Sequence, residues 1–217
     1  MSETPTPTPD DDVLVASGGA VTAPVPGGYP VQVTAVDQVE YARFMPLIKW
    51  LLLIPQYIAL FFVGIAALVT VFIAFFAVLF TGKFPRGMWD FLVGVHRWAL
   101  RVTAYHMLIT DVYPAFSLDE KPGDTVKLHA EYPEHVGNWR ALVAWLLVIP
   151  YAIVASIIVW IASICSFFAF FTIIFTKKIP DGLFNVIRNG LVWQTRSGFY
   201  MYFMSTIYPP FEWEDEK

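Results

Sequence analysis

Charged residues are scarce in this 217-residue chain, and two long stretches contain none at all. Only 15% of the residues are charged, whereas soluble domains average about 25%. No formal charge lies between Trp50 and Phe80, or between Ala141 and Thr176. Each run exceeds the roughly 20 apolar residues with which a helix crosses the hydrocarbon core of a bilayer. A soluble protein of this size could hardly bury two such helices on every side, so we expect an integral membrane protein.

Basic clusters, paired cysteines and cofactor motifs are also missing from the sequence. The net charge is −4, and no block of lysine and arginine is typical of a nucleic-acid-binding surface, so we expect no nucleic-acid partner. The single cysteine, Cys165, cannot form a disulfide within the chain. Phosphate-binding loops, dinucleotide fingerprints, haem motifs and zinc signatures do not occur. We therefore expect no cofactor, no metal site and no catalytic residue, and we predict that the protein is not an enzyme.

The sequence does contain a tandem duplication with a constant offset of 95 residues, the distance from Trp50 to Trp145. The segment Trp50-Leu-Leu-Leu-Ile-Pro55 recurs as Trp145-Leu-Leu-Val-Ile-Pro150. A basic turn, a polar framework and a closing Tyr-Pro-x-Phe motif recur in the same register: Phe80–Gly87 with Phe175–Gly182, Trp98 with Trp193, Arg101 with Arg196, Tyr105 with Tyr200, and Tyr113–Phe116 with Tyr208–Phe211. Such a gap-free register over polar and apolar positions indicates an internal repeat.

Each repeat predicts the same succession of elements. A short alternating segment predicts a strand, and a long apolar helix, a basic turn and a second, more polar helix follow it. Pro55 and Pro150 predict breaks between a short interfacial helix and crossing helices at 56–80 and 151–175. We divide the chain into a polar tail predicted to be disordered (1–28), repeat unit 1 (29–118), a hinge (119–123), repeat unit 2 (124–213) and an acidic C-terminal end (214–217).

The second helix of each repeat places charge inside an otherwise apolar segment. A polar stripe follows one face of the first helix, at Asp90, Gly94, Arg97 and Arg101. The same positions of the second helix are Asn185, Asn189, Val192 and Arg196, with Arg188 beside them. An arginine at the bilayer centre costs about 2.5–3.5 kcal/mol. Residues 87–110 and 182–206 therefore either cross the bilayer with the stripe turned toward partner helices, or lie in its interface as amphipathic helices.

These patterns together predict the fold class and the location. We predict an all-α polytopic membrane protein of two tandem helical hairpins, about four membrane helices in all, with short extramembrane β segments. Both units would have the same orientation in the plasma membrane. The long polar N-terminus favours cytoplasmic termini.

Two interpretations of the basic residues remain open. Arg97 and Arg101, four residues apart, would repel each other on a helix and would be stabilised by an anion. In one interpretation, Asp90 with backbone and aromatic groups satisfies them. In the other, the basic side chains of both second helices form a lipid-phosphate site, made by His96, Arg97, Arg101, Arg188 and Arg196.

The repeated motifs carry a resemblance to a known family. With its Trp-Leu-Leu-x-Ile-Pro, Phe-Thr-x-Lys-x-Pro-x-Gly and Tyr-Pro-x-Phe segments, the chain resembles the bacterial membrane proteins grouped as domain of unknown function 4389, common in actinobacteria. Family members are similar in a Tyr-Pro-x-x-(Leu/Val) segment, here Tyr29–Val33, and in a Tyr-Pro-Glu segment, here Tyr132–Glu134. The first unit departs from the second pattern, with Val36–Gln38 in that place. The resemblance covers about residues 29–213 and implies a fold and a membrane location, but no activity.

Two functions follow as hypotheses. The favoured one is a non-enzymatic accessory or scaffold protein of the cell envelope, which binds membrane lipids, anionic ones included, or other membrane proteins or copies of itself. The alternative is a small transporter or channel, assembled as an oligomer. The location of Asp90, His96 and Arg97 in the structure discriminates between these two hypotheses. A water-filled cavity lined by these three side chains would favour transport, whereas a position at headgroup level would favour the scaffold.

Overall fold

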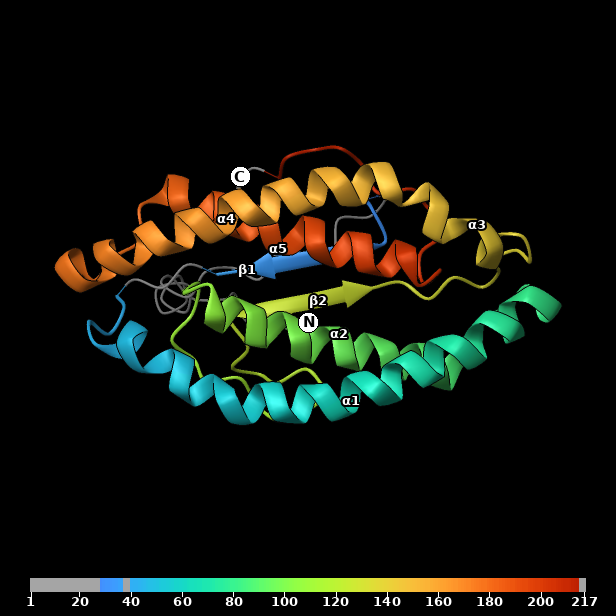
Figure 1. Cartoon of the computed structure of the whole chain (residues 1–217), viewed down its shortest axis with the longest axis horizontal. Helices are drawn as coiled ribbons and strands as arrows, with labels where there is room; N and C mark the ends of the chain where they lie inside the picture. The colour runs from blue at the N-terminus through green and yellow to red at the C-terminus, as the bar shows by residue number, and fades with distance from the viewer. Residues whose placement is uncertain (1–27, 37–39, 215–217) are drawn as a thin grey trace, which may run out of the picture.

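The structure of the protein is a computed structural model that describes residues 28–36 and 40–214. The predicted disordered tail and acidic C-terminal end therefore lie outside the described residues, apart from residues 28 and 214. The described elements, in chain order, are β1 (Val31–Ala35), α1 (Met45–Thr81), α2 (Arg86–His106), β2 (Val126–Ala130), α3 (Arg140–Leu147), α4 (Ile149–Thr176) and α5 (Asp181–Met201). The fold is mostly helical with one small sheet, and both predicted strands are confirmed (Figure 1).

The two repeats lie antiparallel. Helices α1 and α4 form the two long edges of the molecule in Figure 1, and α2 and α5 pack inside them. The colour gradient shows that α1 and α4 run in opposite directions along the long axis. The prediction that both units share one orientation is therefore wrong. The physical reason lies in the strands, because their antiparallel pairing reverses one repeat relative to the other.

The strand register reveals an approximate two-fold axis. Strand β1 pairs antiparallel with β2, and Val33 lies opposite Leu128. These two residues occupy the same position in the 95-residue repeat, so the axis passes between them. Two further hydrogen bonds obey the same symmetry: one from the Tyr41 amide to the Lys177 carbonyl, and one, at equivalent positions, from the Val136 amide to the Gly82 carbonyl, both 2.9 Å long. The duplicated chain thus folds like a dimer of its own repeat.

Each strand packs against the helical hairpin of the other repeat. Strand β1 contacts α5, and β2 contacts α2. Successive side chains of a strand point to opposite faces. The buried face carries Val31, Val33, Ala35, Val126 and Leu128, whereas Gln32, Thr34, Lys127 and His129 alternate with them on the more exposed face. Because of this exchange, the two repeats share one core across the predicted boundary.

The two repeated prolines behave differently. At Pro150 the predicted break is present, since α3 ends at Leu147 and α4 begins at Ile149. At Pro55 the break is absent, because the 37-residue helix α1 continues through the proline. Lys49 and Gln56 anchor α1 on both sides of the proline, through hydrogen bonds to backbone carbonyls of residues 110 and 114. These anchors hold the helix continuous where the sequence alone predicts two helices.

Large apolar side chains cover the outer faces of the two long helices. Phe72 on α1 is 65% exposed, and Trp160 on α4 is 74% exposed. The inner faces carry small residues, with Ala162 and Ala169 fully buried against α5. Within the described residues, α1 and α4 are the two helices long and apolar enough to span a membrane. Whether α2 and α5 also cross a membrane is not shown, so the predicted total of about four membrane helices stays a prediction.

Candidate functional site

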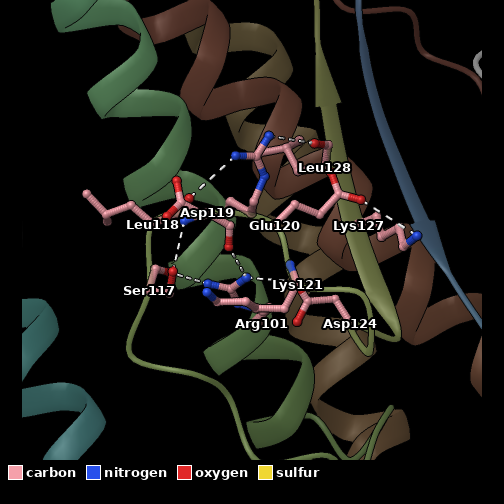
Figure 2. A network of polar contacts seen from close by, with 10 residues as sticks. Arg101, Ser117, Leu118, Asp119, Glu120, Lys121, Asp124, Lys127 and Leu128 are labelled. Atoms are coloured by element: carbon pink, nitrogen blue, oxygen red, sulfur yellow. Dashed lines mark hydrogen bonds and ion pairs between the residues drawn. The ribbon is translucent and has the colours of Figure 1, made fainter.

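In the first repeat, the polar stripe of α2 binds the segment that follows the Tyr-Pro-x-Phe motif (Figure 2). Arg101 donates one Nη1 hydrogen bond to the Asp119 carbonyl at 2.9 Å and forms an ion pair with the Asp124 carboxylate at 2.7 Å. Its Nη2 donates to the Ser117 carbonyl. The guanidinium is buried, and the Asp124 side chain is 8% exposed. Arg101 therefore fixes the segment predicted as a hinge onto α2.

Arg97 extends this network toward the sheet. Its two terminal nitrogens donate to the carbonyls of Leu118 and Leu128, each at 3.4 Å. Leu128 lies at the centre of β2, so Arg97 connects the loop to the strand. Nearby, Lys127 and Glu120 form a more exposed ion pair at 3.6 Å. We call the contacts of Arg97 and Arg101 the first arginine clasp.

A second arginine clasp occupies the equivalent place in repeat 2. Arg196 on α5 forms an ion pair with the Glu214 carboxylate and donates from Nε to the Val31 carbonyl at 3.4 Å. Arg188 donates to the Glu214 carbonyl. The Asn189 side-chain amide donates to the same carbonyl, and its oxygen accepts a hydrogen bond from the Glu214 backbone N–H. Glu214 and Asp119 are equivalent positions in the repeat, as are Arg196 and Arg101. The contact between this arginine and the following segment is thus repeated, although Asp119 accepts through its backbone carbonyl and Glu214 through its carboxylate.

Tyr29 completes the second clasp. Its ring lies beneath the Arg196 guanidinium, 5.0 Å from ring centre to Cζ, and its hydroxyl donates to Ser205 at 3.3 Å. Burial raises the pKa of the Tyr29 hydroxyl above its usual range, although the hydrogen bond to Ser205 and the charge of Arg196 oppose this shift. The hydroxyl therefore stays neutral over the physiological pH range.

The five residues predicted to form one lipid-phosphate site fall into three places. Arg97 and Arg101 belong to the first clasp, Arg188 and Arg196 belong to the second, and His96 lies apart from both. Arg101, Arg188 and Arg196 are buried. Among the buried side-chain atoms of the described residues, the Nε atoms of Arg97, Arg101 and Arg188 have no hydrogen-bond partner. Arg101 and Arg196 pair with carboxylates of the chain, whereas Arg97 and Arg188 donate to backbone carbonyls. Binding of a lipid phosphate by these residues stays a prediction.

His96 faces the opposite side of α2 from the clasp. Its Nδ1 lies 2.8 Å from the Leu92 carbonyl, and its ring packs 4.7 Å from that of Phe199 and 5.9 Å from that of Tyr202. With Tyr202 it lines an apolar cleft of about 410 Å³ between α1 and α2. Asp90 is elsewhere, in an exposed ion pair with Arg86. The three residues proposed to discriminate transport from scaffolding therefore do not share a cavity.

The buried ion pair between Lys49 and Asp111 was not predicted from the sequence. Lys49, near the start of α1, forms an ion pair with Asp111 at 2.7 Å and donates to the Thr110 carbonyl at 2.7 Å. Its ammonium also lies 4.7 Å from the centre of the Tyr105 ring. The equivalent residue in repeat 2 is Ala144, so the repeat pattern gave no signal. The position of Lys49 directly before the apolar run was the one available hint.

These features define a class of protein: a two-repeat helical fold, with an apolar helix and a polar helix in each repeat, and two helices long and apolar enough to span a membrane. The chain belongs to the family described as Domain of unknown function (DUF4389), whose model matches residues 46–117 and 138–212. The two matches correspond to the two repeats, so the resemblance found in the sequence is confirmed. Searches of curated proteins and of solved structures found no match.

Proposed function

We propose that the protein is a non-enzymatic membrane-embedded scaffold of the cell envelope. The observation that carries this proposal is the division of the molecule between an apolar surface and buried arginines that contact the chain's own carbonyls and carboxylates. The outer faces of α1 and α4 expose aromatic and aliphatic side chains along their full length, far more than monomeric soluble proteins expose in one patch. The buried arginines are bound by the chain's own carbonyls and carboxylates, which leaves them a structural role.

The position of the sheet supports a one-sided placement in the membrane. The chain leaves α2 at one end of the molecule and enters α3 at the other, so residues 107–139 run its whole length through β2 (Figure 1). If both hairpins crossed the bilayer, this segment would cross too, with Lys127 and His129 near mid-depth. Charged groups and open strand edges are costly there. We therefore place the sheet and the termini at the cytoplasmic surface of the plasma membrane, and α1 and α4 in the acyl layer.

The exposed polar face around the two-fold axis is where a partner protein would bind. Lys121 and His129 are exposed, and Lys127 is partly exposed beside them. The strands pack on α2 and α5, and we expect this face to stay accessible when α1 and α4 are embedded. The same geometry weakens the transporter alternative, because Asp90, paired at the surface, does not reach the cleft of His96.

Cross-linking with mass spectrometry in native membranes tests the scaffold proposal. A lysine-reactive cross-linker should connect Lys121 or Lys127 to the same membrane protein in independent preparations. A variant with both lysines changed to arginine keeps the charge and should lose these cross-links, which shows that they originate at this face. Recovery of self-cross-links alone, with the chain remaining in the membrane fraction, would refute the accessory role.

A further inference from the structure

We propose that the cleft between α1 and α2 binds a hydrocarbon chain of a membrane lipid; this inference rests on the membrane location proposed above. The cleft has a volume of about 410 Å³, within the range typical of ligand pockets. Helix α1 forms one wall, α2 forms the floor, and Tyr202, just after α5, closes one side. It belongs to repeat 1 and lies on the face of α2 turned away from the first arginine clasp.

The lining of the cleft fits hydrocarbon and little else. Leu60, Ala67 and Val71 of α1 face Leu92 and Ala99 of α2 across the cleft. No charged side chain lines it, and its two side chains with polar groups are His96 and Tyr202. A ligand rich in hydrogen-bonding groups would lose its hydration there without finding enough partners. A saturated or isoprenoid chain has no such groups to desolvate.

The shape and opening of the cleft favour a linear chain that comes from the bilayer. The lining residues of α1 run from Leu60 to Val71, which corresponds to about 16 Å of helix. Phe61 and Leu68 line the cleft and are 66% and 61% exposed, so the cleft is continuous with the outer apolar surface of α1. A lipid chain can therefore enter from the acyl layer without crossing water.

The cleft is specific to the first repeat. In repeat 2, Gly190 occupies the position of Val95, and a Cβ added to Gly190 would lie only 2.6 Å from the Ala162 Cβ. Helices α4 and α5 are therefore in close contact at the place where the cleft opens in repeat 1. Conversely, Gly64 in the cleft occupies the position of Val159, and a Cβ added there would meet nothing within 4 Å. Repeat 1 thus has glycine on its apolar helix and valine on its polar helix, and the cleft between them is open. Repeat 2 has the reverse arrangement, and its two helices are in close contact.

A photolabelling experiment tests this binding site. The full chain is reconstituted in vesicles of phosphatidylethanolamine and phosphatidylglycerol with a trace of phosphatidylglycerol that carries a diazirine on one acyl chain. After irradiation, mass spectrometry quantifies labelled peptides that contain residues 92–99 and the outer-face residue Phe72. Gly64→Leu fills the cleft, because the new side chain meets open space. Ala66→Leu adds the same side chain on the exposed side of α1 and serves as the matched control.

We expect Gly64→Leu to lower labelling of residues 92–99 about tenfold, which corresponds to about 1.4 kcal/mol of lost contact, whereas Ala66→Leu leaves it unchanged. Ala99→Leu fills the same cleft from α2 and gives the same result if Gly64→Leu fails to fold. Undiminished labelling in both cleft variants overturns the site. Labelling at Phe72 without labelling of 92–99 overturns the cleft and spares the membrane location, whereas the loss of both refutes the membrane location itself.

Discussion

Replacing Asp124 by asparagine should destabilise the fold strongly, because Asp124 neutralises a buried arginine. The Arg101 side chain is 5% exposed, and its Nη1 lies 2.7 Å from the Asp124 carboxylate. Asparagine has nearly the same shape and keeps one acceptor oxygen, so the substitution removes mainly the charge. Loss of one partner of a buried ion pair costs about 3–5 kcal/mol. Arg101 keeps the carbonyls of Ser117 and Asp119, so we expect the lower value, about 3 kcal/mol.

The matched control is Glu120→Gln, which removes a carboxylate a few residues away. Its ion pair with Lys127 spans 3.6 Å, and the Glu120 side chain is 45% exposed. Exposed pairs contribute about 0.2–1 kcal/mol, so the control should lose no more than that. Equilibrium unfolding in mixed micelles with increasing dodecyl sulfate, followed by tryptophan fluorescence, measures both variants. If Asp124→Asn lost no more stability than Glu120→Gln, the arginine clasp would not hold the fold as described.

Four further substitutions test other parts of the structure by the same unfolding assay. Gly190→Leu should destabilise by about 1–3 kcal/mol, because its Cβ would lie 2.6 Å from that of Ala162; an unchanged midpoint would contradict the close packing of α4 and α5. Lys177→Gly should stabilise by about 1 kcal/mol, since Lys177 has a left-handed φ of 59° that glycine adopts freely, and the reverse change at its equivalent, Gly82→Ala, should destabilise. Lys49→Met should cost about 3 kcal/mol, because it removes one partner of the buried ion pair with Asp111; a loss below 1 kcal/mol would contradict this.

The sequence predicts the repeat and its elements well because these depend on local pattern. Alternation at Val31–Ala35 and Val126–Ala130 predicts both strands, and the uncharged runs predict the two long helices. The order of elements within each repeat follows in the same way. Strand pairing depends on contacts between segments about 95 residues apart, and period-two alternation contains no information about the partner. The exchange of strands between repeats, and hence the antiparallel arrangement, could not be predicted from that signal.

The candidate site was predicted only in part, for a related reason. The residues of the polar stripe are correctly identified as the main polar groups of α2 and α5. Their partners are backbone carbonyls and two carboxylates, Asp124 and Glu214, which lie in segments that the sequence presents as a hinge region and an acidic end. Backbone carbonyls carry no sequence signature at all. The sequence therefore predicts a ligand site at the arginine stripe without showing the contacts that these arginines make within the fold.

The two repeated prolines show that tertiary contacts can override the tendency of proline to break a helix. Pro55 and Pro150 occur in nearly identical hexapeptides, yet one lies within a helix and the other marks a break. The difference lies in residues that do not repeat. Lys49 becomes Ala144 and Gln56 becomes Tyr151, so repeat 2 lacks both polar anchors and instead stacks Tyr151 on Trp193 at 4.9 Å.

One measurement tests the one-sided membrane placement directly. Single cysteines are introduced at Lys83, Lys178 or His129 in a Cys165→Ser background and treated with a membrane-impermeant maleimide in inside-out and right-side-out vesicles. Lys83 and Lys178 are exposed, equivalent positions in the turns at opposite ends of the molecule, and His129 is exposed on the central sheet (Figure 1). We expect all three cysteines to be labelled in inside-out vesicles only. Labelling of Lys83 and Lys178 from opposite sides would show that the repeats cross the bilayer and would contradict it.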